Sequence, residues 1–416
     1  MVLPHPKPAV GTRDRRRAPQ PEPGTVVGLF AGIGGIEVGL HAAGYRSTLL
    51  CDIEPSSQRV LAHHFPGCVL VGDIRELVHV PVPEVLVGGF PCQDLSQAGR
   101  TAGITGTQSG LVGHVFRLLG QGAAMPRWLL LENVPFMLQL DRGKAMDHLA
   151  TELERLGLTW AYRVVDARSF GLPQRRQRVI LVASATADPR DVLFADEAEA
   201  HVFDGREDLA HGFYWTEGTR GLGWGVNAVP TLKGGSTIGI PSPPAIWMPD
   251  GRVVTPDIRD AERLQGFPVD WTLPAVADLP RVRVGVRWKL VGNAVSVPVA
   301  TWVGSRLTAP GTFDPQRNEP MPTEGSWPLA AWGRRGERHA VRITTYPKRE
   351  PYRDLADFFE YPLAPLSAKA TAGFLRRARA SSLHFVDGFL DGLEAHLRMM
   401  LAELPPRTRA AVRASR

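Results

Sequence analysis

The sequence predicts an α/β protein with a doubly wound, mostly parallel β-sheet, and two observations support this fold class. First, short apolar runs that suit buried strands (TVVGLF, STLLCD, EVLVGG, RWLLL, RVILVAS) alternate with segments of helical periodicity between residues 25 and 184. This alternation is the pattern of successive β–α–β units. Second, the glycine-rich turn LFAGIGG directly follows the first strand. Such a turn lets a ligand approach the carboxyl edge of a parallel sheet.

Length and composition narrow the class of protein further. The chain has 416 residues, of which 44% are hydrophobic and 22% charged, enough for one large core and a smaller domain. Its net charge of +6 suits a polyanionic partner. No apolar run approaches the roughly 18 residues of a membrane span and no secretory signal is visible, so we expect a cytoplasmic protein. Three cysteines without zinc-site spacing predict neither a disulfide framework nor a metal.

The glycine turn and two acidic residues predict a nucleoside-binding pocket. A dinucleotide fingerprint counted from Gly32 and Gly34 requires a third glycine at the position that Glu37 occupies, which argues against a nicotinamide or flavin cofactor. Asp52 follows the second strand and is placed to accept hydrogen bonds from ribose hydroxyls. Asp73 follows the third strand and could accept from an adenine amino group. Acids after successive strands meet at one edge of the sheet.

Cys92 stands apart from the other two cysteines. Cys51 and Cys68 are adequately explained as small buried hydrophobes. Cys92 follows a buried strand and a double glycine, next to a proline and among polar residues, in the segment EVLVGGFPCQDLSQAG. This places it in the crevice at the carboxyl edge of the sheet, where ligands bind. We therefore predict a reactive thiol.

Six motifs occur in the order LFAGIGG, GGFPCQDLS, ENV, QRRQR, RLQGFP and GNAVSVP. On these motifs, residues 25–307 resemble the bacterial carbon-5 cytosine DNA methyltransferases. The resemblance implies a Rossmann-like methyltransferase fold that binds S-adenosylmethionine. It also implies methyl transfer to carbon 5 of a cytosine that is flipped out of duplex DNA, because the reacting atoms are otherwise hidden in the base stack.

The resemblance also implies catalytic roles. Cys92 would add to carbon 6 of cytosine and make the ring an enamine that can attack a methyl sulfonium. Glu132 would hold the ring at nitrogen 3 and the amino group, which requires a protonated or shared-proton carboxyl with a raised pKa. Gln174, Arg176 and Arg178, from QRRQR, would lie near the base and the active-site loop.

Two further sets of residues follow from the resemblance. The expected cofactor-binding residues are Phe30, Gly32, Gly34, Gly35, Asp52, Ile53, Asp73, Ile74, Pro91, Asn293 and Val295. The expected DNA-binding residues are Gln93, Ser96, Thr231 and Leu232.

Two positions depart from the family pattern. Gly28 stands where the family often has an aspartate before the Leu-Phe pair, and we expect little effect because the glycine backbone makes most ligand contacts. Asp52 stands where the family commonly has the longer glutamate, so its ribose contact is expected to be looser.

Composition and motifs together predict six segments. Clustered arginines and prolines mark a basic tail at the N-terminus. Gly and Pro dominate much of residues 185–250, and apolar residues with helical spacing return near the C-terminus. Arg376, Arg377 and Arg379 either contact DNA phosphates or lie on a solvated helix face packed on the core. The segments are a disordered tail (1–24), the catalytic cofactor-binding domain (25–184), a target recognition domain (185–250), the return of the catalytic domain (251–308), a Pro-rich linker (309–340) and a C-terminal helical extension (341–416).

Several alternatives stay open from the sequence. A non-catalytic DNA-binding protein could keep the fold, although an intact Cys92, Glu132 and QRRQR set favours an enzyme. Cytosine methylation of transfer RNA uses the same chemistry, but the Cys-Phe-Thr element expected for that subfamily is missing. We expect a monomer acting on duplex DNA, with or without a cognate restriction endonuclease. The target sequence depends on major-groove contacts that an irregular segment does not reveal.

Overall fold

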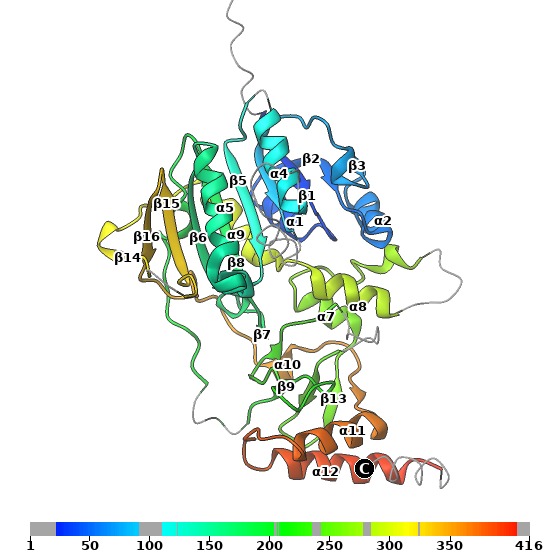
Figure 1. Cartoon of the computed structure of the whole chain (residues 1–416). Helices are drawn as coiled ribbons and strands as arrows, with labels where there is room; N and C mark the ends of the chain where they lie inside the picture. The colour runs from blue at the N-terminus through cyan, green and yellow to red at the C-terminus, as the bar shows by residue number, and fades with distance from the viewer. Residues whose placement is uncertain are drawn as a thin grey trace, which may run out of the picture.

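The structure, a computed structural model, has a large α/β domain and a small lobe (Figure 1). It describes residues 22–90, 110–122, 124–203, 206, 208–234, 243–277, 284–322 and 325–405. The predicted tail (1–24) lies mostly outside these residues, and the first strand begins at Glu22. Within the part of the chain that is described, no helix is long and apolar enough to cross a membrane.

A ten-stranded sheet forms the centre of the large domain. Its strands β1 to β5 are mutually parallel, and β6, β8 and β14–β16 extend the sheet with antiparallel pairings. The α/β fold class is therefore confirmed, with an antiparallel extension beside the parallel half. In spatial order the strands are β14 (Asn318–Pro320), β16 (Glu337–Val341), β15 (Ala330–Arg334), β6 (Thr159–Asp166), β8 (Gln177–Ser184), β5 (Trp128–Asn133), β4 (Pro83–Gly88), β1 (Glu22–Leu29), β2 (Arg46–Cys51) and β3 (Val69–Val71).

Helices cover both faces of this sheet, because the buried strands carry apolar side chains on both faces. In β1, Val27 packs in one core with α4 and α5, whereas Val26 packs in a second core with α1 and α9. Figure 1 shows α4 and α5 in front of the sheet and α9 behind it. The helices of this domain are α1 (Gly35–Ala42), α2 (Pro55–His64), α4 (Leu111–Gln121), α5 (Lys144–Arg155), α6 (Arg190–Leu193) and α9 (Val297–Thr308).

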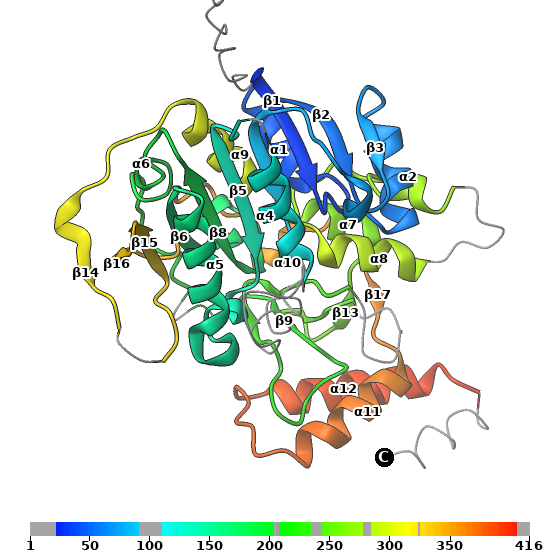
Figure 2. The same ribbon diagram turned by 45° about the horizontal axis from the view of Figure 1, so that its top comes forward.

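The small lobe consists of a five-stranded sheet covered by two C-terminal helices. Phe213 of the sheet meets Phe374 and Phe389 of the helices, each with ring centroids 5.1 Å apart. Figure 2 shows the two helices lying together beneath the lobe. The lobe contains β10 (Gly225–Val226), β9 (His211–Phe213), β12 (Ala245–Trp247), β13 (Val253–Thr255), β17 (Ala364–Pro365), α11 (Ala368–Arg379) and α12 (Phe389–Ala402).

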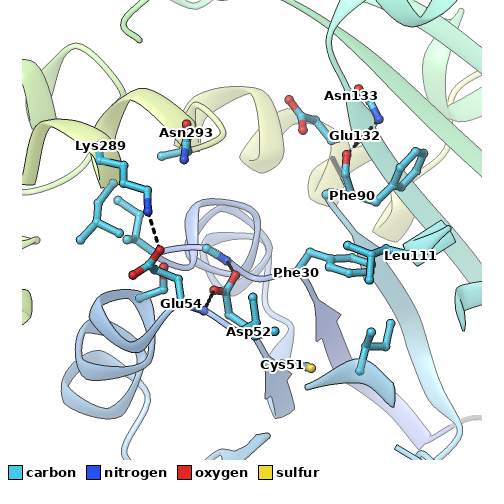
Figure 3. A pocket seen from close by; sticks show the side chains of 18 of the residues that line it. Phe30, Cys51, Asp52, Glu54, Phe90, Leu111, Glu132, Asn133, Lys289 and Asn293 are labelled. Carbon is cyan, nitrogen blue, oxygen red and sulfur yellow. Dashed lines mark hydrogen bonds and ion pairs between the residues drawn. The ribbon is translucent and has the colours of Figure 1, made fainter. Parts of the chain in front are cut away.

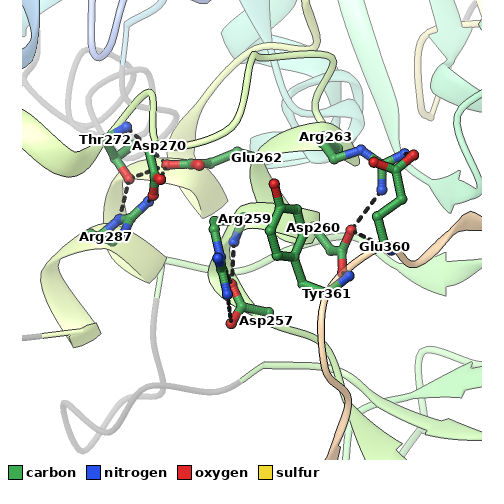
Figure 4. Close-up of polar contacts among 10 residues, drawn as sticks. All are labelled: Asp257, Arg259, Asp260, Glu262, Arg263, Asp270, Thr272, Arg287, Glu360 and Tyr361. Atoms are coloured by element: carbon green, nitrogen blue, oxygen red, sulfur yellow. Dashed lines mark hydrogen bonds and ion pairs between the residues drawn. The ribbon is translucent and has the colours of Figure 1, made fainter.

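Three short helices and a two-stranded sheet join the lobe to the large domain. In Figure 4, buried Glu262 of α7 pairs with Arg287 of α8 at 2.9 Å, and Asp260 of α7 accepts hydrogen bonds from the backbone N–H groups of Glu360 and Tyr361. Helix α7 is therefore bonded both to α8 and to the C-terminal segment. The joining elements are α7 (Ile258–Arg263), α8 (Val284–Asn293), α10 (Leu355–Phe358), β7 (Gln174–Arg175) and β11 (Val229–Pro230).

The structure differs from the predicted segments in two places. Residues 309–340 are not simply a linker, because they contain β14, β15 and the start of β16. The prolines that suggested a linker are compatible with this position, since β14 is an edge strand and edge strands tolerate proline. The extension (341–416) contains helices, as expected, but its strand β17 pairs with β13 and completes the sheet of the small lobe.

Candidate active site

A cavity of about 620 Å³ opens at the carboxyl ends of β1, β2, β4 and β5. Figure 3 shows Phe30, Asp52 and Glu132 around it, each just beyond or at the end of a different strand. Asn293 reaches the same cavity from the end of α8, more than 150 residues later in the chain. Its size is that of a pocket for a small organic ligand.

The glycine turn packs tightly beneath this cavity. Phe30 and Gly32 line the cavity and both have positive φ, 57° and 56°. Gly34 and Gly35 do not line it. A Cβ on Gly34 would lie 2.5 Å from the Phe65 ring, and one on Gly35 would lie 2.4 Å from the carbonyl oxygen of Val295. These two glycines therefore allow the turn and α1 to approach their neighbours closely.

Asp52 is fixed at the turn by the backbone. Its Oδ2 accepts a hydrogen bond of 2.7 Å from the Gly32 N–H, and its Oδ1 accepts one of 2.9 Å from the Glu54 N–H. Burial raises the pKa of Asp52, and these two hydrogen bonds oppose that rise. Each carboxylate oxygen has a second lone pair, so the carboxylate can still accept from hydroxyls of a ligand. Ile53 lines the same cavity and is largely exposed.

Two other expected cofactor residues follow β3, the neighbour of β2 in the sheet. Asp73 and buried Ile74 both line it. Asp73 is held by Arg75, whose hydrogen bonds lower the pKa of Asp73 to about 2. An ion pair of 2.5 Å between Glu54 and Lys289 joins two elements of the lining, α8 and the residue that precedes α2.

Glu132 and Arg178 form an ion pair in the wall of the cavity. They come from the adjacent antiparallel strands β5 and β8, and Arg178 Nε lies 2.9 Å from Glu132 Oε1. Burial raises the pKa of Glu132, although the two guanidinium groups of Arg176 and Arg178 oppose the rise. The direction of this shift is the one expected from the sequence. The carboxyl can hold or share a proton at the cavity surface.

The predicted nucleophile falls outside the described residues, as do Pro91, Gln93 and Ser96. The described chain leads up to Phe90, which lines the cavity. The Phe90 carbonyl oxygen accepts a hydrogen bond of 3.0 Å from Nδ2 of Asn133, the residue that follows Glu132 in the chain. Phe90 is therefore held beside the end of β5.

Gln174 and Arg176, which were expected near the base and the active-site loop, do not line the cavity. Gln174 donates to the Leu264 carbonyl at 2.8 Å and accepts from the Leu232 N–H at 3.0 Å. Arg176 is fully buried and donates to the carbonyls of Leu232, Gly292 and Ala294. Both side chains saturate backbone groups that would otherwise be buried without partners. Arg176 thereby connects Leu232 to the segment that carries Asn293.

The two expected DNA-binding residues of the lobe differ in accessibility. The Leu232 side chain is 2% exposed and packs in an apolar cluster with Trp288 and Leu355, so it is unavailable to DNA. Thr231 is partly exposed, and its hydroxyl donates to the Arg175 carbonyl at 2.8 Å.

The structure also brings to the cavity residues that sequence reasoning missed. Lys289 lies in a helix that the sequence analysis did not predict, and Leu111 lies at the start of α4. Neither belongs to a motif with a recognisable spacing. Asn133 is the exception, since its place in LLLENV beside Glu132 marks it as a strand-end polar residue.

Comparisons with known proteins agree with this geometry. The family model described as C-5 cytosine-specific DNA methylase matches residues 24–203. The chain is also 47% identical over 379 residues to the Type II methyltransferase M2.BsuMI of Bacillus subtilis (strain 168), an alignment that covers 89% of this chain and 97% of that protein. The chain belongs to the C-5 cytosine-specific DNA methylases.

Two further similarities define how far the relationship extends. The methylase is 28% identical over 314 residues to the Type II methyltransferase M.DsaV of Dactylococcopsis salina, covering 68% of this chain and 85% of that protein. A crystal structure of the Dnmt2 methyltransferase of S. pombe has a TM-score of 0.51 and 18% identity, covering 68% of this chain and 98% of that chain. At this identity the structural likeness supports the fold alone.

Proposed function

We propose that the methylase transfers a methyl group from S-adenosylmethionine to carbon 5 of a flipped-out cytosine in duplex DNA, with Cys92 as the nucleophile. One observation carries this proposal. The Glu132–Arg178 pair lines the same cavity as Asp52 and Asn293, so a base-holding carboxyl and a nucleoside-binding edge share one space. Family membership supplies the reaction class.

The residues around the cavity fit adenosylmethionine. Asp52 offers a fixed carboxylate to ribose hydroxyls, and Asp73 offers an acceptor to the adenine amino group. The glycine turn leaves backbone accessible beside Phe30 and Gly32, and Asn293 closes the far side. When bound, the cofactor supplies an electrophilic methyl group on its sulfonium.

The protein's part in the chemistry is to activate and orient the base. The Cys92 thiolate adds to carbon 6, and the electron density that this releases makes carbon 5 nucleophilic. Glu132, with its raised pKa, holds nitrogen 3 and the amino group and stabilises the charge that develops there. Carbon 5 takes the methyl group as the bond between that methyl group and the sulfonium breaks, and the proton on carbon 5 then leaves to solvent. The thiolate leaves carbon 6, which restores the aromatic ring and the free enzyme.

We propose that the small lobe is the target recognition domain and that the C-terminal extension is part of it. Arg377 of α11 donates to the backbone carbonyls of Trp215 and Glu217, and Arg379 pairs with Glu394 of α12. These contacts favour a packing role over phosphate binding for both arginines. The M2.BsuMI alignment leaves out fewer residues than the extension contains, so the extension is at least partly shared with that relative.

Three finer assignments complete the proposal. The named relatives are Type II methyltransferases, which supports a cognate restriction endonuclease that reads the same DNA sequence. We propose that the methylase acts in the cytoplasm, where bacterial DNA is accessible, and that it acts as a monomer.

Replacing the nucleophile tests the proposed mechanism. The variant Cys92→Ser should lose transfer of labelled methyl groups to duplex DNA and lose covalent trapping by DNA that contains 5-fluorocytosine, while it still binds adenosylhomocysteine. The matched control Cys68→Ser changes a thiol that donates to the Ser47 carbonyl outside the cavity and should keep both activities. Persistent trapping by Cys92→Ser would refute the assignment of the nucleophile.

The substrate is tested separately. Duplex DNA should be methylated and transfer RNA should not, and bisulfite sequencing of DNA from cells that express the protein should reveal one methylated sequence. Methylation of RNA alone would replace the DNA proposal with the transfer-RNA alternative.

A further inference from the structure

Glu37 is a buried acid without a partner. It lies in the first turn of α1 and is 1% exposed. Neither of its carboxyl oxygens has a hydrogen-bond partner among the residues that the structure describes. An unpaired buried carboxylate is costly, so such a group is either kept protonated or awaits a partner that the chain itself does not supply.

The carboxyl borders an extension of the cofactor cavity. Glu37 lines a small cavity of about 40 Å³ together with Phe30, Gly32 and Asn293, and these three residues also line the large cavity. The small cavity has room for a group of only a few atoms. Asp52 and Asp73 line the large cavity but not the small one, so the small cavity is a separate recess beside the turn that holds Phe30 and Gly32.

The space that Glu37 occupies depends on Gly28. A Cβ on Gly28 would lie 2.2 Å from Glu37 Oε1, a distance that two atoms cannot adopt. The missing side chain in β1 thus makes room for a carboxyl that comes from α1. Gly28 is one of the two departures from the family pattern, and its role here is to accommodate Glu37.

The electrostatics of the small cavity suit a cation. None of the described residues that line it is basic, whereas Glu37 and Glu132 are acidic. Burial raises the pKa of Glu37 to about 7, and the nearby Asp52 adds to the rise. A bound cation would offset the cost of ionising this carboxyl. Adenosylmethionine carries an ammonium group at its amino-acid end, opposite the adenosine.

We propose that Glu37 binds the α-ammonium group of adenosylmethionine and thereby fixes the amino-acid end of the cofactor. This inference rests on the proposed function, because it assumes adenosylmethionine in the large cavity. It adds to the binding set a residue from α1 that lies outside the LFAGIGG turn.

Calorimetric binding of three ligands tests the role of Glu37. The probes are adenosylhomocysteine, its analogue without the amino group, and 5′-methylthioadenosine, which lacks the whole amino-acid end. The wild type should prefer adenosylhomocysteine to the deaminated analogue by about tenfold to a hundredfold, the range of a charge-assisted hydrogen bond. Glu37→Gln should lose most of that preference and bind 5′-methylthioadenosine as the wild type does.

Two comparisons separate the possible failures. Glu152→Gln, which removes an acid on the outer helix α5, is the control and should leave all three affinities unchanged. If Glu37→Gln keeps the full preference for the amino group, the role of Glu37 is overturned while the proposed function stands. If the wild type binds neither adenosylhomocysteine nor 5′-methylthioadenosine, both this inference and the proposed cofactor are overturned.

Discussion

Arg176 and Arg178 show how much a role depends on the side chain's surroundings. They are two positions apart in one motif, yet Arg178 pairs with Glu132 at the cavity, while buried Arg176 donates to backbone carbonyls. Arginine serves both purposes because its fixed fork of donors can meet either a carboxylate or several carbonyls. The motif alone does not distinguish these two uses.

We predict that Arg176→Ala destabilises the fold, whereas Arg178→Ala mainly impairs catalysis. Removing the Arg176 guanidinium leaves three buried carbonyls without this donor, which should lower the free energy of unfolding by about 3 kcal/mol. Chemical denaturation of both variants measures this difference. The loss of catalysis is measured as the rate of methyl transfer at a temperature where both variants remain folded. If Arg176→Ala were as stable as the wild type, the proposed structural role of Arg176 would be contradicted.

At the scale of helices and strands, the sequence predicts the parallel half of the sheet well. Strands β1, β2, β4 and β5 are short, buried and apolar on both faces, which is a strong signal. Strand β6 was missed, although it is buried, because TWAYRVVD mixes polar and apolar residues. Its Arg163 is buried only because carbonyls of Leu193, Asp196 and Thr344 accept from it, and such distant partners are invisible in the sequence.

For the candidate site too, some residues could be predicted from the sequence and others could not. Residues at the ends of predicted strands, such as Asp52 and Glu132, were found because the fold fixes where strand ends meet. Gln174 and Leu232 were assigned to ligand contacts by motif, but tertiary packing buries them. Glu37 was noticed only as a missing glycine, since nothing in the sequence reveals that Gly28 leaves space for its carboxyl.

Helix α7 leads to a prediction at this scale. Asp260→Ala should lower the free energy of unfolding by about 3 kcal/mol, because buried Asp260 accepts from the backbone of Glu360 and Tyr361 and pairs with Arg263. Hydrogen exchange should show faster exchange at the Glu360 and Tyr361 amides. Asp250→Ala, which breaks an exposed ion pair with Arg252, is the control and should change little. Unchanged exchange at those amides would mean that α7 does not anchor the C-terminal segment.

At the scale of the whole molecule, the small lobe is assembled from distant parts of the chain. Strands β9, β10, β12 and β13 lie between residues 211 and 255, but β17 and helices α11 and α12 come from residues 364–402. Phe389 joins these parts, since it is fully buried against Phe213, Trp224 and Trp247. The lobe and the C-terminal extension therefore share one core.

We predict that Phe389→Ala disrupts the lobe and spares the cofactor site. Removing a fully buried aromatic ring should cost about 3–5 kcal/mol, concentrated in the lobe. DNA methylation should fall sharply while adenosylhomocysteine binding by calorimetry is retained. Val386→Ala, at a side chain that is 47% exposed, should change neither property. Loss of cofactor binding together with DNA methylation would show that the two parts of the molecule do not behave separately.

The late position of β17 has a consequence for synthesis. Ribosomes make the chain from its N-terminus, so the strands that surround the cofactor cavity are complete while the lobe still lacks its last strand and both covering helices. The sheet of the lobe can close only after residues 364–402 have emerged. A nascent chain thus acquires the strands around its cavity before its lobe is finished.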